Sequence, residues 1–308
     1  MALNLNVQRK ACEARMVRQA HHRRSSRACR GMRPLRSLVV VLACVLCARP
    51  GAQESLTDAA RRKTFDQILD LYVRGGDVYY RAIKAERAKL DGYVNLLATT
   101  SVATLSRGEQ LAFWLNAYNA LVLRTVVDHY PIQGRSTDYP PKSIRQIPGA
   151  FERLTHRVAG RALTLDQIEQ TVLSEFHDPR VYFALGRGAI GSGRLRSEAF
   201  VAGRLEEQLA EVAGECVTRA QCIQIERDAG KVKISSIFSW REKEFVAAYA
   251  DAAPPAFATR GPIERAVLTF VEPKLLPAEK EFIAKNTFQV VYTPFDWTLN
   301  DLTGRGGR

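Results

Sequence analysis

Ser192 is the side chain whose place in the sequence most suggests a nucleophile. It lies in Gly191-Ser192-Gly193, soon after the apolar run VYFAL at 181–185, whose continuous apolar pattern predicts a fully buried strand. A strand-to-helix turn is where α/β enzymes hold a nucleophilic serine, but that motif needs glycine two positions before and two after the serine. Ile190 and Arg194 occupy those positions, so the motif is absent.

A serine nucleophile also needs a base. Only His129, His156 and His177 follow residue 52, and none has a spacing that catalysis requires, so we interpret each as structural or solvated. Asp296 opens the segment DWTLN, which predicts a turn in which the aspartate side chain satisfies backbone groups. His177 and Asp296 stay candidate partners of Ser192 in case the fold brings them close to it.

The segment 186–196 is rich in glycine and arginine. Its backbone N–H groups could form a nest for an anion ahead of the helix expected from residue 197. The alternative is a flexible turn whose arginines are solvated. The candidate binding residues here are Gly191, Ser192, Arg194 and Arg196.

A helix expected over 106–130 must support this segment. Ser106 and Glu109 have the spacing of a capping box, and the apolar residues that follow cover every face, which predicts a helix buried all round. Asn116 and Asn119 lie within that apolar surface, one turn apart. A buried amide without partners costs roughly 1–3 kcal/mol, so we expect each asparagine either to pin a neighbouring segment or to take part in a site.

The remaining pattern predicts an α+β domain in which the buried helix packs on a small mixed or antiparallel sheet. Turn residues at Ala159-Gly160 and at 228–230 predict two β-hairpins, and residues 288–292 read as a last strand. Helices are expected over 56–73, 78–97, 164–176, 197–217, 236–250 and 262–270. The predicted organisation is a leader at 1–52, a helical lead-in at 53–104, the main domain at 105–302 and a disordered tail at 303–308.

The first 52 residues have the character of a leader. They hold 11 of the 45 Lys and Arg and one of the 32 Asp and Glu, so the net charge without them falls from +13 to +3. The basic balance therefore gives no reason to expect a nucleic-acid partner. An apolar run at 37–48 follows a basic stretch, as in a secretory signal, and Met32 is an alternative start to Met1. We expect a periplasmic or secreted protein, and three alternatives stay open for its leader: cleavage at an undetermined position, a lipid anchor at Cys44 or an uncleaved anchor.

Cys216 and Cys222 are the two cysteines beyond the leader. In an oxidising compartment they would form a disulfide joining the end of a helix to the start of a strand, and the alternative is two free thiols. Neither cysteine has a histidine nearby in the sequence, so we expect no metal site. No cofactor is expected either, which leaves an unidentified small molecule or an envelope protein as the partner.

Four segments, in order, resemble the family catalogued as domain of unknown function 547. They are FWLNAYNAL at 113–121, LTLDQIE at 163–169, DPRVYFAL at 178–185 and FDWTLN at 295–300. The resemblance spans about 105–300. It implies a protein common among bacterial exported proteins whose biochemical function is not established.

This chain departs from the pattern of that family at four positions. Where members usually carry histidine, it has Gln170 and Tyr182, and where they usually carry cysteine, it has Arg187 and Ser192. The usual pattern implies a cysteine activated by histidine, as in papain-like or transglutaminase-like hydrolases. We therefore expect a non-catalytic binding or scaffolding protein, with a cleft between segment 186–196 and the buried helix. The alternative is a hydrolase or acyl-transfer enzyme that uses Ser192.

Overall fold

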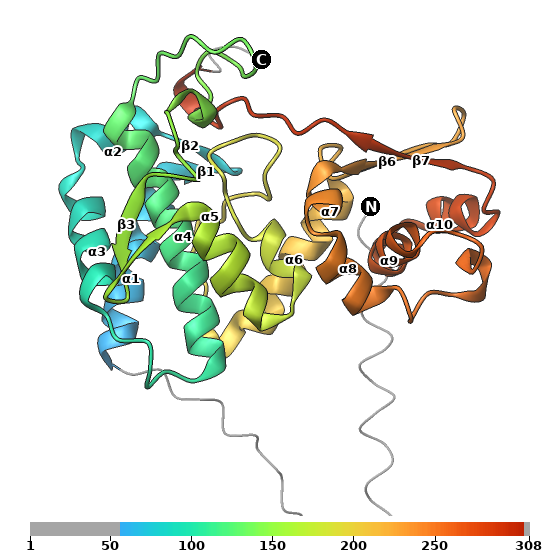
Figure 1. Cartoon of the computed structure of the whole chain (residues 1–308), viewed down its shortest axis with the longest axis horizontal. Coiled ribbons are helices and arrows are strands. Elements are labelled where there is room, and N and C mark those ends of the chain that lie inside the picture. The colour runs from blue at the N-terminus through green and yellow to red at the C-terminus, as the bar shows by residue number, and fades with distance from the viewer. Residues whose placement is uncertain (1–55, 305–308) are drawn as a thin grey trace, which may run out of the picture. The chain divides into compact units, whose positions relative to one another are not determined.

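A computed structural model describes residues 56–304, and Figure 1 shows how their elements are arranged. The predicted leader, including Met32 and Cys44, lies outside the described residues, as does the end of the predicted tail. The α-helices are α1 (Leu56–Tyr72), α2 (Tyr80–Ala85), α3 (Ala88–Thr99), α4 (Arg107–His129), α5 (Leu165–Gln167), α6 (Leu205–Thr218), α7 (Ser236–Trp240), α8 (Glu242–Tyr249), α9 (Pro262–Val271) and α10 (Pro277–Ala284). The strands are β1 (Val73–Arg74), β2 (Asp77–Val78), β3 (Thr155–Val158), β4 (Arg161–Thr164), β5 (Ile223–Glu226), β6 (Lys231–Ser235) and β7 (Gln289–Thr293).

Helix α4 is the buried helix that the sequence predicts. Its capping box is present: the Glu109 backbone N–H donates to Ser106 Oγ over 3.3 Å, and the Ser106 N–H donates to Glu109 Oε2 over 2.8 Å. Almost every residue from Leu111 to Val127 is buried. Helices α2, α3 and α5 pack against it, and Figure 1 shows it in green beside α3 and α5. A helix that is apolar all round is stable only with neighbours on all sides.

The strands form small sheets, which confirms the α+β class. Strands β3 and β4 pair as a hairpin, and its turn residues Ala159 and Gly160 have φ angles of 50° and 71°. Strands β5 and β6 form the second predicted hairpin, and β7 pairs with β6 in parallel, giving the order β5-β6-β7. Within residues 56–304, no helix combines the length and the apolar character needed to cross a membrane.

The predicted strand at 181–185 is wrong. Residues Pro179–Phe183 form a 3₁₀-helix, η4, which Asp178 caps by accepting the Arg180 N–H over 3.0 Å. The run is fully buried, as predicted, but a short buried apolar run has the same pattern in a strand and in a helical turn. Because Asp178 caps it and proline stands at its first position, the turn is helical. Ser192 therefore does not follow a strand.

Several predicted helices have different bounds. The one expected over 78–97 is two helices, α2 and α3, and the one expected from residue 197 begins as α6 only at Leu205. The segment 164–176 starts with the expected capping box, in which the Gln167 N–H donates to Thr164 Oγ1 over 3.1 Å. It continues as a π-helical turn, η2 (Ile168–Val172), and a 3₁₀ turn, η3 (Leu173–Phe176).

The chain after β7 returns to the first elements. In Figure 1 this dark red segment runs from β7 towards β1 and β2. Leu299 pairs with Ala189, and Asp301 pairs with Val78. The Asn300 side chain accepts the Tyr80 hydroxyl over 2.7 Å and donates to Gly76 O over 2.8 Å. Segment 186–196 is thus held between α4 on one side and the C-terminal segment on the other.

Candidate functional site

Asn116 and Asn119 both hold backbone, and Asn116 also lines a small cavity beside Phe113 and Phe200. Asn119 accepts the Gly186 N–H over 2.8 Å and donates to Ala184 O over 3.1 Å. Asn116 makes the same pair of bonds with the backbone of Phe200, over 2.8 and 2.9 Å. In each asparagine, both the side-chain oxygen and the side-chain nitrogen are therefore hydrogen-bonded to backbone. The two backbone segments lie at the two ends of the glycine-rich loop. Of the two roles considered for these asparagines, the pinning role matches these contacts.

Ser192 shares a small cavity with the Glu215 carboxylate but is not hydrogen-bonded to it. The side chain is 4% exposed, and its Oγ accepts the Arg187 backbone N–H over 3.0 Å. Arg219, which lies between the two cysteines, donates to Ser192 O over 3.2 Å. Among residues 56–304, no histidine or carboxylate is hydrogen-bonded to the Ser192 hydroxyl. A serine hydroxyl needs such a base to attack at neutral pH.

The two candidate partners of Ser192 lie elsewhere. His177 adopts a left-handed conformation, with φ 56°, and lines an open groove together with Arg180 and Lys274. Asp296 is exposed, and its Oδ1 accepts the Thr298 N–H over 2.9 Å, which is the turn that the sequence predicts. Its backbone O accepts the Gly191 N–H over 2.8 Å. Asp296 thus meets the loop through its backbone, and its carboxylate caps its own turn.

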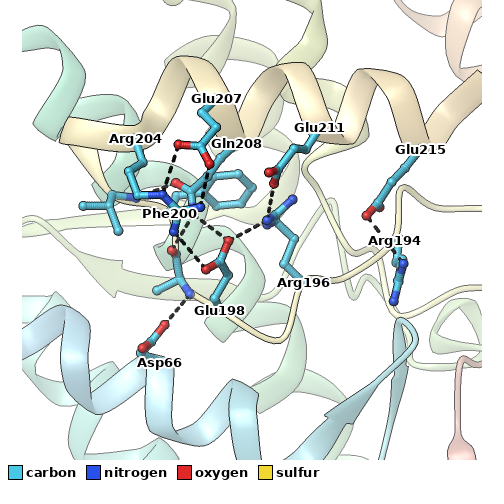
Figure 2. Close-up of polar contacts among 12 residues, drawn as sticks. Asp66, Arg194, Arg196, Glu198, Phe200, Arg204, Glu207, Gln208, Glu211 and Glu215 are labelled. Atoms are coloured by element: carbon cyan, nitrogen blue, oxygen red, sulfur yellow. Dashed lines mark hydrogen bonds and ion pairs between the residues drawn. The ribbon is translucent and has the colours of Figure 1, made fainter. Parts of the chain in front are cut away.

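Arg194 and Arg196 are already paired with glutamates of α6. Figure 2 shows Arg196 between Glu198 and Glu211, at 2.5 and 2.6 Å, and Arg194 beside Glu215 at 3.5 Å. Loop glycines serve close packing: a Cβ on Gly193 would lie 1.6 Å from Phe183 O. The loop is therefore a packed connection whose positive charges are compensated by carboxylates.

Cys216 and Cys222 are joined as a disulfide. The bridge connects the last turn of α6 to the residue before β5, as the sequence argument placed it. Among the described residues, no group of three or more His, Cys, Asp or Glu side chains could hold a metal ion.

A different cavity gathers groups that could bind a ligand, and the sequence reasoning missed it. We call it the Arg–Trp pocket. Its volume is about 200 Å³, larger than the roughly 150 Å³ cavity in another protein that holds one benzene. It lies between η2 and the segments around residues 145, 240 and 297. The residues that line it are Arg145, Phe151, Asp166, Glu169, Gln170, Arg187, Trp240, Arg241 and Trp297.

A buried carboxylate organises one wall of the pocket. Glu169 accepts from Arg187 Nη2 over 2.6 Å, from Arg241 Nη2 over 2.7 Å and from the Tyr118 hydroxyl over 3.1 Å. Burial alone would raise the pKa of Glu169, but the charges and hydrogen bonds of Arg187 and Arg241 outweigh it and lower this pKa to about 2. Glu169 is therefore ionised at neutral pH and fixes both guanidinium groups. It lies in the π-helical turn η2, and such turns are frequent at functional sites.

Asp166 is the second carboxylate of the pocket, one turn before Glu169. Among residues 56–304, no group donates a hydrogen bond to its side chain. Burial raises the pKa of Asp166, the negative charges of Glu152 and Glu169 raise it further, and Arg145 and Arg241 act in the opposite direction. The two carboxylates therefore differ: Glu169 is fully paired, and Asp166 is available to a ligand.

Aromatic rings form the other walls. The guanidinium carbon of Arg145 lies 4.5 Å from the ring centroids of both Phe151 and Trp297. Trp240 stacks at 6.1 Å and 23° on Trp297 and is 44% exposed. The Arg–Trp pocket thus combines flat apolar surfaces with fixed charges, which is the usual composition of a small-molecule site.

Comparison with known families assigns one segment of the chain. Residues 102–216 match the model of a family described as a protein of unknown function, DUF547. This segment is a DUF547 domain. The family expected from the sequence is therefore confirmed, although the fourth resembling segment, 295–300, lies outside the matched residues. No match was found among curated proteins or among solved structures.

The DUF547 match and the Arg–Trp pocket overlap only in part. Arg145, Asp166, Glu169 and Arg187 lie inside the matched residues, whereas the segment from Trp240 onwards lies outside them. Two aromatic walls and one arginine of the pocket therefore come from the C-terminal part of the chain.

Three of the four departures from the family pattern meet at this pocket. Gln170 and Arg187 line it. The Tyr182 ring lies 4.5 Å from the guanidinium carbon of Arg241, and its backbone O accepts Arg187 Nη1 over 3.1 Å. Only Ser192 lies apart, in contact with the backbone of Arg187. The substitutions themselves were the sequence signal that could have located the pocket.

Proposed function

We propose that this chain is an exported, non-catalytic binding protein of the cell envelope, and that the Arg–Trp pocket holds a small-molecule ligand. The observation that carries the proposal is the chemistry of the pocket. A cavity of about 200 Å³ is lined by aromatic rings, by two arginines fixed on a buried glutamate and by Asp166, whose side chain accepts no hydrogen bond from residues 56–304. Export rests on the composition of the leader alone.

Catalysis has less support than binding. The residues that line the Arg–Trp pocket include no serine, cysteine, histidine or lysine. Its carboxylates, which can also act as nucleophiles, are Asp166 and Glu169, and Glu169 is held by two arginines. Where the resemblance implies a cysteine and a histidine, Arg187 and Gln170 stand, and neither can attack a substrate or accept a proton at neutral pH. The alternative enzyme would use Ser192, whose hydroxyl is buried on a backbone N–H.

The proposal is tested by blocking the pocket from its rim. Gln170 is exposed and lines the pocket, whereas its neighbour Thr171 is exposed and does not. We expect the deproteinised small-molecule extract of the native host to raise the melting temperature of the wild type and of Thr171→Trp, but not that of Gln170→Trp. Equal shifts in all three proteins would place the binding elsewhere, and no shift in any of them would contradict the proposal.

A further inference from the structure

We propose that the Arg–Trp pocket recognises a small organic zwitterion, a free α-amino acid in its simplest form. This inference rests on the proposed function and names the class of its ligand. The ammonium group would be bound by Asp166 and the carboxylate by Arg145 and Arg241, with the side chain against the indole rings of Trp240 and Trp297.

Asp166 supplies the site for the positive end. Its carboxylate lies at the pocket without a hydrogen-bond donor among residues 56–304, although burial has removed part of its hydration. An ionised group in such a place is stabilised by an opposite charge that donates hydrogen bonds. An ammonium group, with its three donors, meets this requirement.

Arg145 and Arg241 supply the site for the negative end. Arg145 uses Nη1 on Glu152, and Arg241 uses Nη2 on Glu169. Within the described residues, Nη2 of Arg145 has no acceptor, and Nη1 of Arg241 has only Glu244 at 3.8 Å, which is too long for a hydrogen bond. Each guanidinium group is held by its ion pair and by stacking on aromatic rings. Its Nε is buried without a partner, and one terminal nitrogen is left for a ligand. Guanidinium groups fixed in this way are well suited to a carboxylate.

The presence of both charges at one cavity excludes the simpler ligand classes. A ligand with only negative charge would meet Asp166, and one with only positive charge would meet Arg145 and Arg241. A neutral sugar would leave the Asp166 carboxylate without a counter-charge that donates hydrogen bonds to it, in a partly desolvated space. The volume of about 200 Å³ admits a molecule of the size of an amino acid. The aromatic walls favour a side chain with apolar surface.

Calorimetric titration of the full chain tests the inference. The probes are glycine, leucine and phenylalanine, together with N-acetylphenylalanine, phenylalaninamide and the neutral sugar N-acetylglucosamine. We expect phenylalanine to bind, and each modified form to bind at least about tenfold more weakly, because each loses one charge-assisted interaction. In Asp166→Asn, we expect N-acetylation of phenylalanine to weaken binding by less than about threefold. In Arg145→Gln, we expect amidation to weaken binding by less than about threefold. Asp228→Asn, which removes an exposed carboxylate in the β5–β6 turn, is the matched control and behaves as the wild type.

Three results would overturn the inference. One is binding of N-acetylphenylalanine or phenylalaninamide as tight as that of phenylalanine. Another is binding of N-acetylglucosamine without binding of any amino acid. The third combines two observations. The wild type binds no amino acid, yet host extract still raises its melting temperature and does not raise that of Gln170→Trp. In that third case the pocket binds a ligand of another class and the proposed function survives.

Discussion

Glu169 and Arg187 form an ion pair in the interior, with 2.6 Å between Oε1 and Nη2 and side chains only 7% and 3% exposed. The same carboxylate oxygen lies 2.7 Å from Arg241, so one negative charge holds two positive ones. Since removing one partner of a buried pair leaves an uncompensated charge, Glu169 is expected to stabilise the fold as well as the pocket.

The first prediction concerns that pair. We expect Glu169→Gln to lower the free energy of unfolding by about 3–5 kcal/mol, because Arg187 stays buried without a counter-charge and Arg241 keeps only Glu244, at 3.8 Å. Since the pKa of Glu169 is lowered in the fold, its contribution is present above the pKa of an unfolded glutamate, about 4.3. It is lost as the pH falls towards 2. Urea denaturation at pH 7 measures the loss, with the exposed Glu175→Gln as control. If both variants unfold at the same urea concentration, the role assigned to Glu169 is wrong.

The second prediction uses Asp166, whose pKa is shifted in the opposite direction from that of Glu169. Burial raises its pKa, so the stability that this group contributes is present below the pKa of an unfolded aspartate, about 3.9. It is lost as the pH rises through the folded pKa. We therefore expect Asp166→Asn to melt about 2 °C higher than the wild type at pH 7, and the gain to disappear near pH 3. A lower melting temperature for the variant at pH 7 would show that Asp166 is stabilised by a protein partner.

The third prediction concerns the asparagines of α4. Asn119→Ala should cost about 1–3 kcal/mol of unfolding free energy, because Gly186 N–H and Ala184 O lose their partner inside the fold. Asn95→Ala, at an exposed position of α3, is the matched control and should change stability by less than about 0.5 kcal/mol. Chemical denaturation of the two variants decides whether Asn119 pins the loop.

The structure confirms the predictions that rest on a local motif compatible with only one conformation. The capping boxes at Ser106 and Thr164 and the turn at Ala159-Gly160 are determined within a few residues, and each is found where expected. The burial of α4 also followed from its apolar faces. The run at 181–185 was different, because its apolar pattern predicted burial but could not distinguish a strand from a helical turn.

The pocket could not be assembled from the sequence, because its residues come from four distant segments. In the sequence, Asp166 and Glu169 were identified only as residues at the start of a predicted helix. Trp240 and Arg241 belonged to no recognisable motif. The loop around Ser192 drew attention through its glycines, which the structure explains by close packing such as that of Gly193. The substituted positions Gln170 and Arg187 pointed more directly to the site than the glycine-rich loop did.

A fourth prediction separates binding from catalysis at Ser192. We expect Ser192→Ala to leave the ligand-induced rise in melting temperature unchanged, and to cost about 1–3 kcal/mol of stability, because the buried Arg187 N–H loses its acceptor. A substrate-turnover assay with host extract tests the alternative, in which Ser192 is catalytic. If turnover is present in the wild type and absent from a folded Ser192→Ala protein, the enzyme reading replaces the binding one.

The fifth prediction concerns the disulfide. Replacing both Cys216 and Cys222 by alanine should lower the free energy of unfolding by roughly 2 kcal/mol, as the chain-entropy model gives for a loop of this length. Arg219 lies within the loop and donates to Ser192 O, so amide exchange should rise around segment 186–196. The double variant is compared with the wild type under oxidising conditions. Identical exchange in that segment would show that the loop does not depend on the bridge.

The central claim is that the Arg–Trp pocket holds a small molecule, and a native mass spectrum tests it most directly. The wild type, Gln170→Trp and Thr171→Trp are each isolated from the native host without denaturation. We predict that the wild type and Thr171→Trp carry the same additional small mass, which is released on unfolding, and that Gln170→Trp lacks it. Wild-type protein without any bound mass, or the same mass on all three proteins, would contradict the account.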